Sequence, residues 1–215
     1  MRNLVASVIV MACLVATPAL ASEIVFSNLG AGGSYQCCVG DNVNGGSFAE
    51  RDVASPFTPS GSFTLDSIEV ALTWLQGVNV GDILLRSDNG GLPGQILESF
   101  HVTGLPTFTT TSTVLAVGIS TLHPTLTSGL QYWVVASTSD SSLLSFNLNN
   151  TGDAGEGFGF NFGTTWDFRP GFTAGAFRVN GSPIAPSTIP EPTSFLLLAT
   201  GVVATIGRRR MRCPR

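Results

Sequence analysis

Hydrophobic and polar residues alternate with a period of two along much of the chain between residues 22 and 189. The clearest case is the segment 68–74 (IEVALTW), in which large apolar side chains occupy every second position. A period of two places those side chains on one face of a strand, so we predict a half-buried β-strand there. The segments 131–137 (QYWVVAS) and 158–162 (FGFNF) predict two further strands. No stretch of this region shows the 3.6-residue period of an amphipathic helix.

Gly-, Pro- and Asn-rich segments separate these strands from others. The segment Ser87–Gly94 is a dense turn signal between 83–86 and 95–102, which predicts a β-hairpin with a longer loop. Further strands are expected at 23–28, 114–119, 142–148 and 172–179. About nine or ten short strands without helices predict an all-β fold. We expect an antiparallel β-sandwich, with a jelly roll as one form of it.

The N-terminus departs from this pattern. A basic start, Met1–Asn3, precedes the apolar run Leu4–Val15, and Ala19 and Ala21 form an Ala-x-Ala cleavage signature before Ser22. This predicts a signal peptide over 1–21. A lipoprotein signal that uses Cys13 is the alternative.

The C-terminus is a tail in three parts. Pro190-Glu191-Pro192 precedes the uncharged run 193–207, and the basic residues Arg208, Arg209, Arg210 and Arg212 follow it. A helix of that length spans about 22 Å, less than the roughly 30 Å of a bilayer core, but arginines can reach the interface and favour the cytoplasmic side. We predict a transmembrane helix over 193–207, a linker over 181–189 and a folded domain over 22–180. A C-terminal amphipathic or core helix is the alternative.

The three-part tail resembles a PEP-CTERM sorting signal. The resemblance implies an exported protein of a Gram-negative bacterium that makes exopolysaccharide. The precursor would be held in the inner membrane by the helix until an exosortase-type membrane peptidase processes it for the cell surface or the extracellular matrix.

The middle of the chain resembles the "choice-of-anchor R" domains. The similar segments are Ser27–Gly30, Tyr35–Gly40, Phe63–Glu69, Ser87–Gly94 and Gln131–Trp133. This family brings no established activity, so the resemblance bears on fold and placement only.

The charge of the domain differs from that of the whole chain. The net charge of −4 includes six arginines in the two ends, whereas the region 22–189 has four arginines, thirteen acidic residues and no lysine. Such an acidic domain argues against binding nucleic acid or anionic lipid. The neutral, hydroxyl-rich remainder fits a structural or adhesive protein that contacts envelope polysaccharide.

Cys37-Cys38 is the unusual pair of the exported region. Oxidising conditions outside the cytoplasm favour disulfides. A vicinal disulfide between the two is the main hypothesis, and two free thiols or bridges to another chain are the alternatives.

Few residues are candidates for chemistry. Trp166, beside a Gly-Thr-Thr segment, is a candidate glycan platform, and His101 and His123 are the only histidines available to a Ser-His-Asp site. A secreted hydrolase that acts on matrix polysaccharide through carboxylates such as Glu50 and Asp167 is the alternative function. No catalytic residue, metal or cofactor is expected, although the segments Asp88–Gly90 and Asn149–Asp153 could offer oxygens to calcium.

Overall fold

The computed structural model describes residues 21–109, 113–160 and 165–184. These residues are all-β, with one short 3-10 turn at Ala31–Gly33 and no α-helix. The described part of the chain contains no helix that is both long enough and apolar enough to cross a membrane. The predicted signal peptide, apart from Ala21, and the predicted helix over 193–207 lie outside the described residues.

Fourteen strands make up the described fold, and they pair antiparallel within three sheets. This confirms the predicted all-β class with antiparallel sheets. The strands are β1 (Glu23–Ser27), β2 (Gly40–Asn44), β3 (Asp52–Phe57), β4 (Phe63–Val70), β5 (Leu72–Gly77), β6 (Val80–Asp88), β7 (Pro93–Thr103), β8 (Ala116–Ile119), β9 (Thr125–Leu126), β10 (Tyr132–Ser137), β11 (Ser142–Asn147), β12 (Ala154–Phe160), β13 (Thr165–Thr173) and β14 (Phe177–Pro183).

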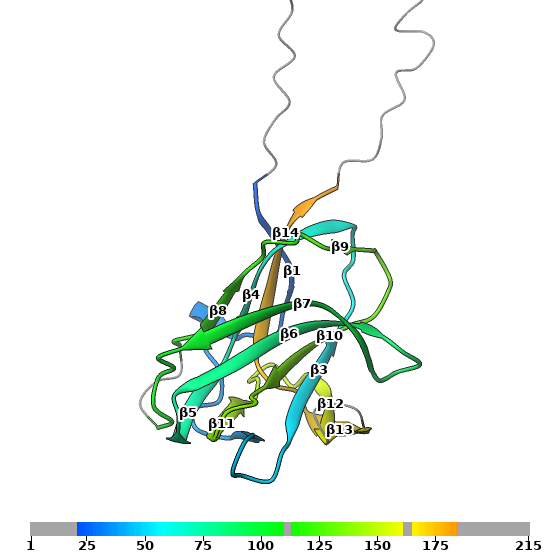
Figure 1. Cartoon of the computed structure of the whole chain (residues 1–215). Coiled ribbons are helices and arrows are strands. Elements are labelled where there is room, and N and C mark those ends of the chain that lie inside the picture. Colours follow the sequence, from blue (N-terminus) through cyan, green and yellow to red (C-terminus); the bar gives the residue numbers. More distant parts are fainter. Residues whose placement is uncertain (1–20, 110–112, 161–164, 185–215) are drawn as a thin grey trace, which may run out of the picture. The chain divides into compact units, whose positions relative to one another are not determined.

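The strands form two layers around one main core, as in a sandwich. One layer is the six-stranded sheet β13-β12-β3-β10-β6-β7. The other contains the sheet β1-β14-β4-β8, in which β9 also pairs with β4, and the three-stranded sheet β2-β11-β5. Figure 1 shows β7 and β6 crossing in front of β14 and β4. Buried apolar side chains of both layers, such as Ile68 of β4 and Val134 of β10, belong to one contiguous cluster.

The two smaller sheets join at Ala71, the residue between β4 and β5. The Ala71 N–H donates to Ala176 O (2.9 Å), and the Asn147 N–H donates to Ala71 O (2.9 Å). The buried Asn147 side chain donates through Nδ2 to the same Ala71 carbonyl (2.9 Å) and to Thr73 Oγ1 (3.0 Å). Asn147 therefore fastens β11 to the point where the strand passes from one sheet to the next.

Two aromatic side chains of β13, an edge strand of the six-stranded sheet, cover part of the outer face of that sheet. Ala54, Trp133 and Val135 form a small buried cluster there, and Trp166 and Phe168 of β13 pack against it. Because this face is covered as well as the core face, five successive residues of β10 are buried. A continuous apolar run rather than strict alternation therefore marks this strand.

The sequence pattern does not predict β3, although β3 lies near the middle of the six-stranded sheet. Its segment contains Pro56, and proline lacks the N–H that a strand with two neighbours needs. β12 pairs only with residues 52–54, so at Pro56 the strand has β10 as its single neighbour. The end of the β12 ladder is what makes proline tolerable there.

The domain extends beyond its predicted end at residue 180. β14 continues to Pro183, inside the predicted linker 181–189, because residues 181–183 pair with β4. A Cβ atom at Gly181 would lie 2.7 Å from Thr64 O. Gly181 therefore permits the close approach of two strands. The composition of residues 181–189 had instead indicated a linker.

Candidate functional site

The predicted targeting residues lie mostly outside the described part of the chain. This holds for Pro190-Glu191-Pro192, for the basic cluster Arg208–Arg212 and for Ala19. Ala21 and Ser22 are described, are exposed and directly precede β1. The folded domain therefore begins immediately after the predicted cleavage site.

Cys37 and Cys38 lie in the loop before β2. Their sulfur atoms are bonded to each other, their Cα atoms are 3.0 Å apart, and the peptide bond between them is cis. The half-buried Cys37 packs against a cluster of Tyr35, Ala71 and Ala176. The cysteine pair thus belongs to the loop that covers the junction of the two smaller sheets.

Thiol alkylation followed by peptide mass analysis tests this bond in the purified protein. We expect the peptide with Cys37 and Cys38 to remain unmodified without reductant, because both sulfurs are committed to the disulfide. Alkylation of both after reduction is the positive control. Two alkylated cysteines without reductant would contradict the prediction.

Trp166, the predicted glycan platform, is half-buried on β13. Its indole lies over glycines of β12, because a Cβ atom at Gly159 would be 2.9 Å from Cη2 and one at Gly157 would be 3.5 Å from Cε3. The Arg86 guanidinium lies over the indole, 5.6 Å from its centroid. These contacts cover part of the ring, so Trp166 offers less surface to a sugar than an exposed tryptophan would.

The histidines do not form the arrangement of a Ser-His-Asp site. Ser137, Asp82 and His101 lie in one row across β10, β6 and β7, and His101 Nδ1 is 3.0 Å from Asp82 Oδ1. In a catalytic triad the histidine stands between the serine and the carboxylate, whereas here Asp82 stands between the other two. His123 Nδ1 lies 2.9 Å from Leu65 O, where it supports the loop after β8.

Ser137 is hydrogen-bonded to Asp52 of β3, which is 3 % exposed. Burial raises the pKa of Asp52 to about 6, although a hydrogen bond with Ser137 and the positive charge of Arg86 oppose that rise. Asp52 is therefore partly protonated in mildly acidic solution, and its side chain is buried from solvent.

The carboxylates of the predicted hydrolase have different neighbours. Asp167 Oδ2 accepts a hydrogen bond from Arg169 Nε at 2.9 Å on the exposed side of β13. Glu50 is half-buried ahead of β3, where its negative charge acts on Asp52. Glu50 and Asp167 therefore share no neighbour among these contacts, and the contacts do not define a common site for them.

Sequence reasoning missed a charged cluster between the layers at β2 and β12. Glu156 is 0 % exposed, and its carboxyl group lies beside the Asp41 side chain. Next to it, Asp41 Oδ1 accepts a hydrogen bond from Arg51 Nη2 at 2.6 Å, and the Arg51 guanidinium lies 4.3 Å from the Phe158 ring centroid. Burial, followed by the charge of Asp41, raises the pKa of Glu156 to about 9. Glu156 is thus a neutral acid at pH 7 that substrates in solution cannot reach.

The two candidate calcium segments turn their oxygens towards the chain itself. Asn149 Oδ1 accepts hydrogen bonds from the N–H groups of Thr151 (3.1 Å), Gly152 (2.9 Å) and Asp153 (3.1 Å). Asp88 likewise accepts bonds from its surroundings, including the Gly91 N–H at 3.1 Å. Over the described ranges, no group of three or more His, Cys, Asp or Glu side chains is placed to hold a metal ion.

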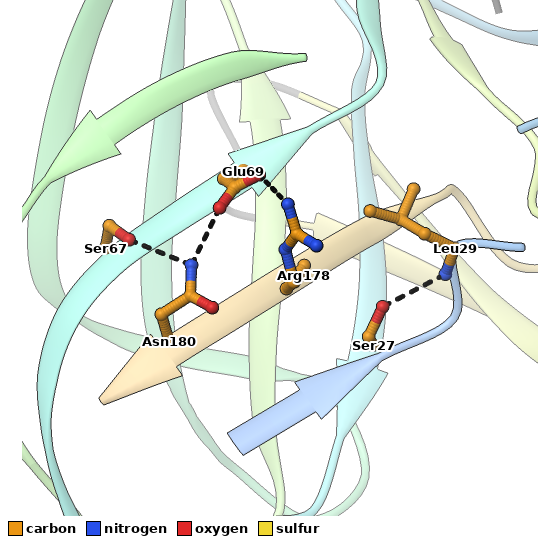
Figure 2. Close-up of polar contacts among 6 residues, drawn as sticks. All are labelled: Ser27, Leu29, Ser67, Glu69, Arg178 and Asn180. Carbon is orange, nitrogen blue, oxygen red and sulfur yellow. Dashed lines mark hydrogen bonds and ion pairs between the residues drawn. The ribbon is translucent and has the colours of Figure 1, made fainter. Parts of the chain in front are cut away.

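A polar network links β4 and β14 on the outer face of their sheet (Figure 2). Glu69 accepts hydrogen bonds from Arg178 Nη2 on one oxygen and from Asn180 Nδ2 on the other, the latter at 2.8 Å. Asn180 Nδ2 also donates to Ser67 Oγ at 3.0 Å. These polar side chains satisfy one another across the strands.

An open pocket of about 440 Å³ lies where β6, β9 and the loop before β10 meet. Its volume falls within the roughly 300–1,000 Å³ typical of small-molecule sites. The sequence predicted the Ser87–Gly94 turn, which contributes Ser87 and Asp88 to this pocket. It did not indicate that Thr125 and residues 129–132 would lie next to that turn. The lining residues are Ser87, Asp88, Leu97, Thr125, Gly129, Leu130, Gln131 and Tyr132.

Asp88 is the acidic residue of this pocket, and its carboxylate is held in place. Its Oδ1 accepts hydrogen bonds from Gln131 Nε2 and Trp133 Nε1, both at 2.9 Å, and its Oδ2 accepts the bond from Gly91. Asp88 is exposed, and although some desolvation opposes its ionisation, the hydrogen bonds from Trp133, Gly91, Gln131 and Gly90 outweigh it and lower the pKa of Asp88. The pocket therefore presents an ionised acceptor in a fixed orientation.

The chain thus joins a sandwich-like all-β domain to a separate C-terminal segment. The family model of the PEP-CTERM protein-sorting motif matches residues 188–210, which include Pro190-Glu191-Pro192 and the arginines 208–210. This match confirms the sorting motif predicted from the tail and supports export by exosortase-type sorting of a membrane-held precursor in a Gram-negative bacterium. No curated protein matches the chain.

Proposed function

We propose that this chain is an exported component of the bacterial cell envelope or extracellular matrix. The β-domain, of the choice-of-anchor R type, acts by structure, adhesion or weak contact with polysaccharide rather than by catalysis. The observation that carries this proposal is the sorting-motif match at residues 188–210, which follows the folded β-domain in the sequence. It gives the domain a destination outside the cytoplasm, where polysaccharide is the abundant partner.

The use of the acidic side chains within the domain supports a non-catalytic role. Glu98, Asp88 and Glu69 each accept hydrogen bonds from donors of neighbouring strands or turns. Catalysis by carboxylates needs a pair that faces a substrate across a cleft. These carboxylates instead hold the loops and strands of the domain together.

Replacing Pro190-Glu191-Pro192 by three alanines tests the sorting part of the proposal. We expect the uncleaved precursor to accumulate in the inner-membrane fraction of an exosortase-producing host, because the peptidase loses its recognition motif. Cell fractionation with intact-mass measurement reports both location and processing. Pro186→Ala, outside the matched segment, is the control, and processing of the triple variant at the control rate would refute the assignment.

Incubation of the exported protein with matrix polysaccharide from its host separates the proposed role from the hydrolase alternative. We expect the protein to sediment with the polysaccharide and to release no reducing ends from it. Release of reducing ends by the wild type, abolished in Glu50→Gln or Asp167→Asn, would support the hydrolase instead.

A further inference from the structure

The pocket beside the β6–β7 turn takes its walls from both layers of the sandwich. Leu97 of β7 and Tyr132 of β10 belong to the six-stranded sheet, whereas Thr125 of β9 belongs to the opposite one. Figure 1 shows the β6–β7 turn and the loop between β9 and β10 on the same side of the domain. The pocket therefore lies at one end of the sandwich, where the two layers separate.

The apolar part of the lining consists mainly of Leu130, Leu97 and Tyr132. Leu130 is 55 % exposed, and Leu97 is half-buried. The Tyr132 hydroxyl is already engaged, since it accepts a hydrogen bond from the Thr127 N–H at 2.9 Å. The ring of Tyr132 therefore contributes packing surface more than polar contact.

The polar part of the lining carries a single negative charge. The Asp88 carboxylate is oriented by hydrogen bonds from Gln131, Trp133 and Gly91, and the Gly90 N–H also favours its ionised form. Hydroxyl groups that donate to an ionised acceptor form the stronger class of hydrogen bond. Ser87 and Thr125 add hydroxyls to the lining, which contains no Lys, Arg or His.

The rim of the pocket is fixed before any ligand arrives. The Gly129 N–H donates to Pro59 O and Ser128 Oγ donates to Ser60 O, both at 2.9 Å. Across the pocket, the Asn89 N–H closes the β6–β7 turn by donating to Leu92 O at 2.8 Å. A preformed site loses less conformational entropy on binding, which favours affinity for a small ligand.

We propose that this pocket binds a neutral hexose unit of a polysaccharide. A pyranose ring has an apolar C–H face, which fits the apolar part of the lining, and hydroxyl donors, which fit Asp88. Uronic acids and phosphorylated sugars would be repelled by the same carboxylate, with no basic residue in the lining to offset it. This inference rests on the proposed function and names the surface through which the domain contacts a glycan.

Isothermal titration of the full-length chain tests the proposal, in a detergent whose head group is not a sugar. The probes are neutral hexasaccharides of glucose, mannose and galactose, with hexagalacturonate as the acidic comparison. We expect at least one neutral probe to bind and the acidic one not to bind. No binding of any neutral probe, or equal binding of hexagalacturonate, would overturn the proposal.

Leu130→Glu should weaken binding of the neutral probe at least tenfold, since it adds a charge to the apolar part of the lining. Leu130→Ala, which only removes apolar surface, should weaken it about threefold. Leu122→Glu is the matched control, because Leu122 is 69 % exposed and is not among the pocket-lining residues. An unchanged unfolding midpoint shows that each variant is folded.

The proposed function and the pocket can fail separately. If Leu130→Glu binds the neutral probe as tightly as Leu122→Glu does, the pocket is not the site, whereas glycan contact stands. If no probe binds but the exported protein still sediments with matrix polysaccharide, the pocket proposal falls and the matrix role stands. Failure of sedimentation as well would remove both.

Discussion

Replacing Glu98 by alanine is expected to lower the free energy of unfolding by about 2–4 kcal/mol. Glu98 of β7 is 4 % exposed and accepts hydrogen bonds from Ser120 Oγ (2.6 Å), the Thr121 N–H (2.7 Å) and the Leu122 N–H (3.0 Å). It therefore fastens the loop after β8 to the opposite layer. Removal of the carboxylate leaves several donors without their acceptor, which costs more than the loss of one neutral hydrogen bond.

The pH dependence of Glu98→Ala distinguishes this cause from lost packing. Burial opposes ionisation of Glu98, but the hydrogen bonds from Ser120, Leu122 and Thr121 prevail and lower its pKa. A lowered folded-state pKa contributes stability above the unfolded pKa of about 4.3, and this contribution is lost as the pH falls through the folded value. The stability difference from wild type should therefore shrink below about pH 4.

Urea unfolding between pH 3 and pH 7 measures this difference. Ser99→Ala is the matched control, because Ser99 is the exposed neighbour of Glu98 on the same strand, and a change within about 0.5 kcal/mol is expected. A Glu98→Ala protein as stable as this control at pH 7 would show that the loop does not depend on the carboxylate.

Replacing Glu156 by glutamine is expected to stabilise the domain, by up to about 3–4 kcal/mol at pH 7. Glu156 must take up a proton to fold, because its pKa rises from an ordinary value of about 4.3 to about 9 on burial beside Asp41. Its stabilising contribution is complete below the unfolded pKa and is lost as the pH rises to the folded pKa. Glutamine has nearly the same shape, needs no proton and so avoids this cost.

The measurement is the free energy of unfolding in urea at pH 5, 7 and 8.5. The advantage of Glu156→Gln over wild type should grow with each step in pH. Glu23→Gln, an exposed carboxyl on β1, is the control and should change stability by less than about 0.5 kcal/mol. A difference that stays constant between pH 5 and 8.5 would contradict the proton uptake assigned to Glu156.

The strands that the sequence predicts well are those whose own residues carry the signal. The turn Ser87–Gly94 lies between β6 and β7 as expected, whereas the single strand predicted over 68–74 is wrong. The chain passes from β4 to β5 at Ala71, and beyond it Thr73 is buried while Trp74 is half-buried, so the alternation does not continue. The predicted strand over 172–179 is different, because Phe172 belongs to β13 and β14 begins at Phe177. Residues 165–173 form the separate strand β13 because they pair with β12 in a hairpin. Local propensity does not reveal this pairing.

The polar groups of the structure were less predictable than its strands. The donors to Glu98 are 22–24 positions away in the sequence. Glu156 lies beside Asp41, which belongs to β2, far earlier in the sequence. In the sequence both glutamates look like ordinary polar positions of strands. Burial opposes ionisation of both glutamates; at Glu98 the hydrogen-bond donors outweigh it and lower the pKa, whereas at Glu156 the nearby Asp41 adds to it and the pKa rises.

By itself the sequence determined the class of the fold and the presence of a sorting motif. Both are written in contiguous residues: a period of two follows from strand geometry, and the motif at 188–210 is a linear signal. Only the tertiary structure decided which carboxylates are ionised, which are neutral and where a pocket opens. Those properties depend on burial and on donors contributed by distant strands, because the free energy of a charge is set by its surroundings in space and not by its neighbours along the chain.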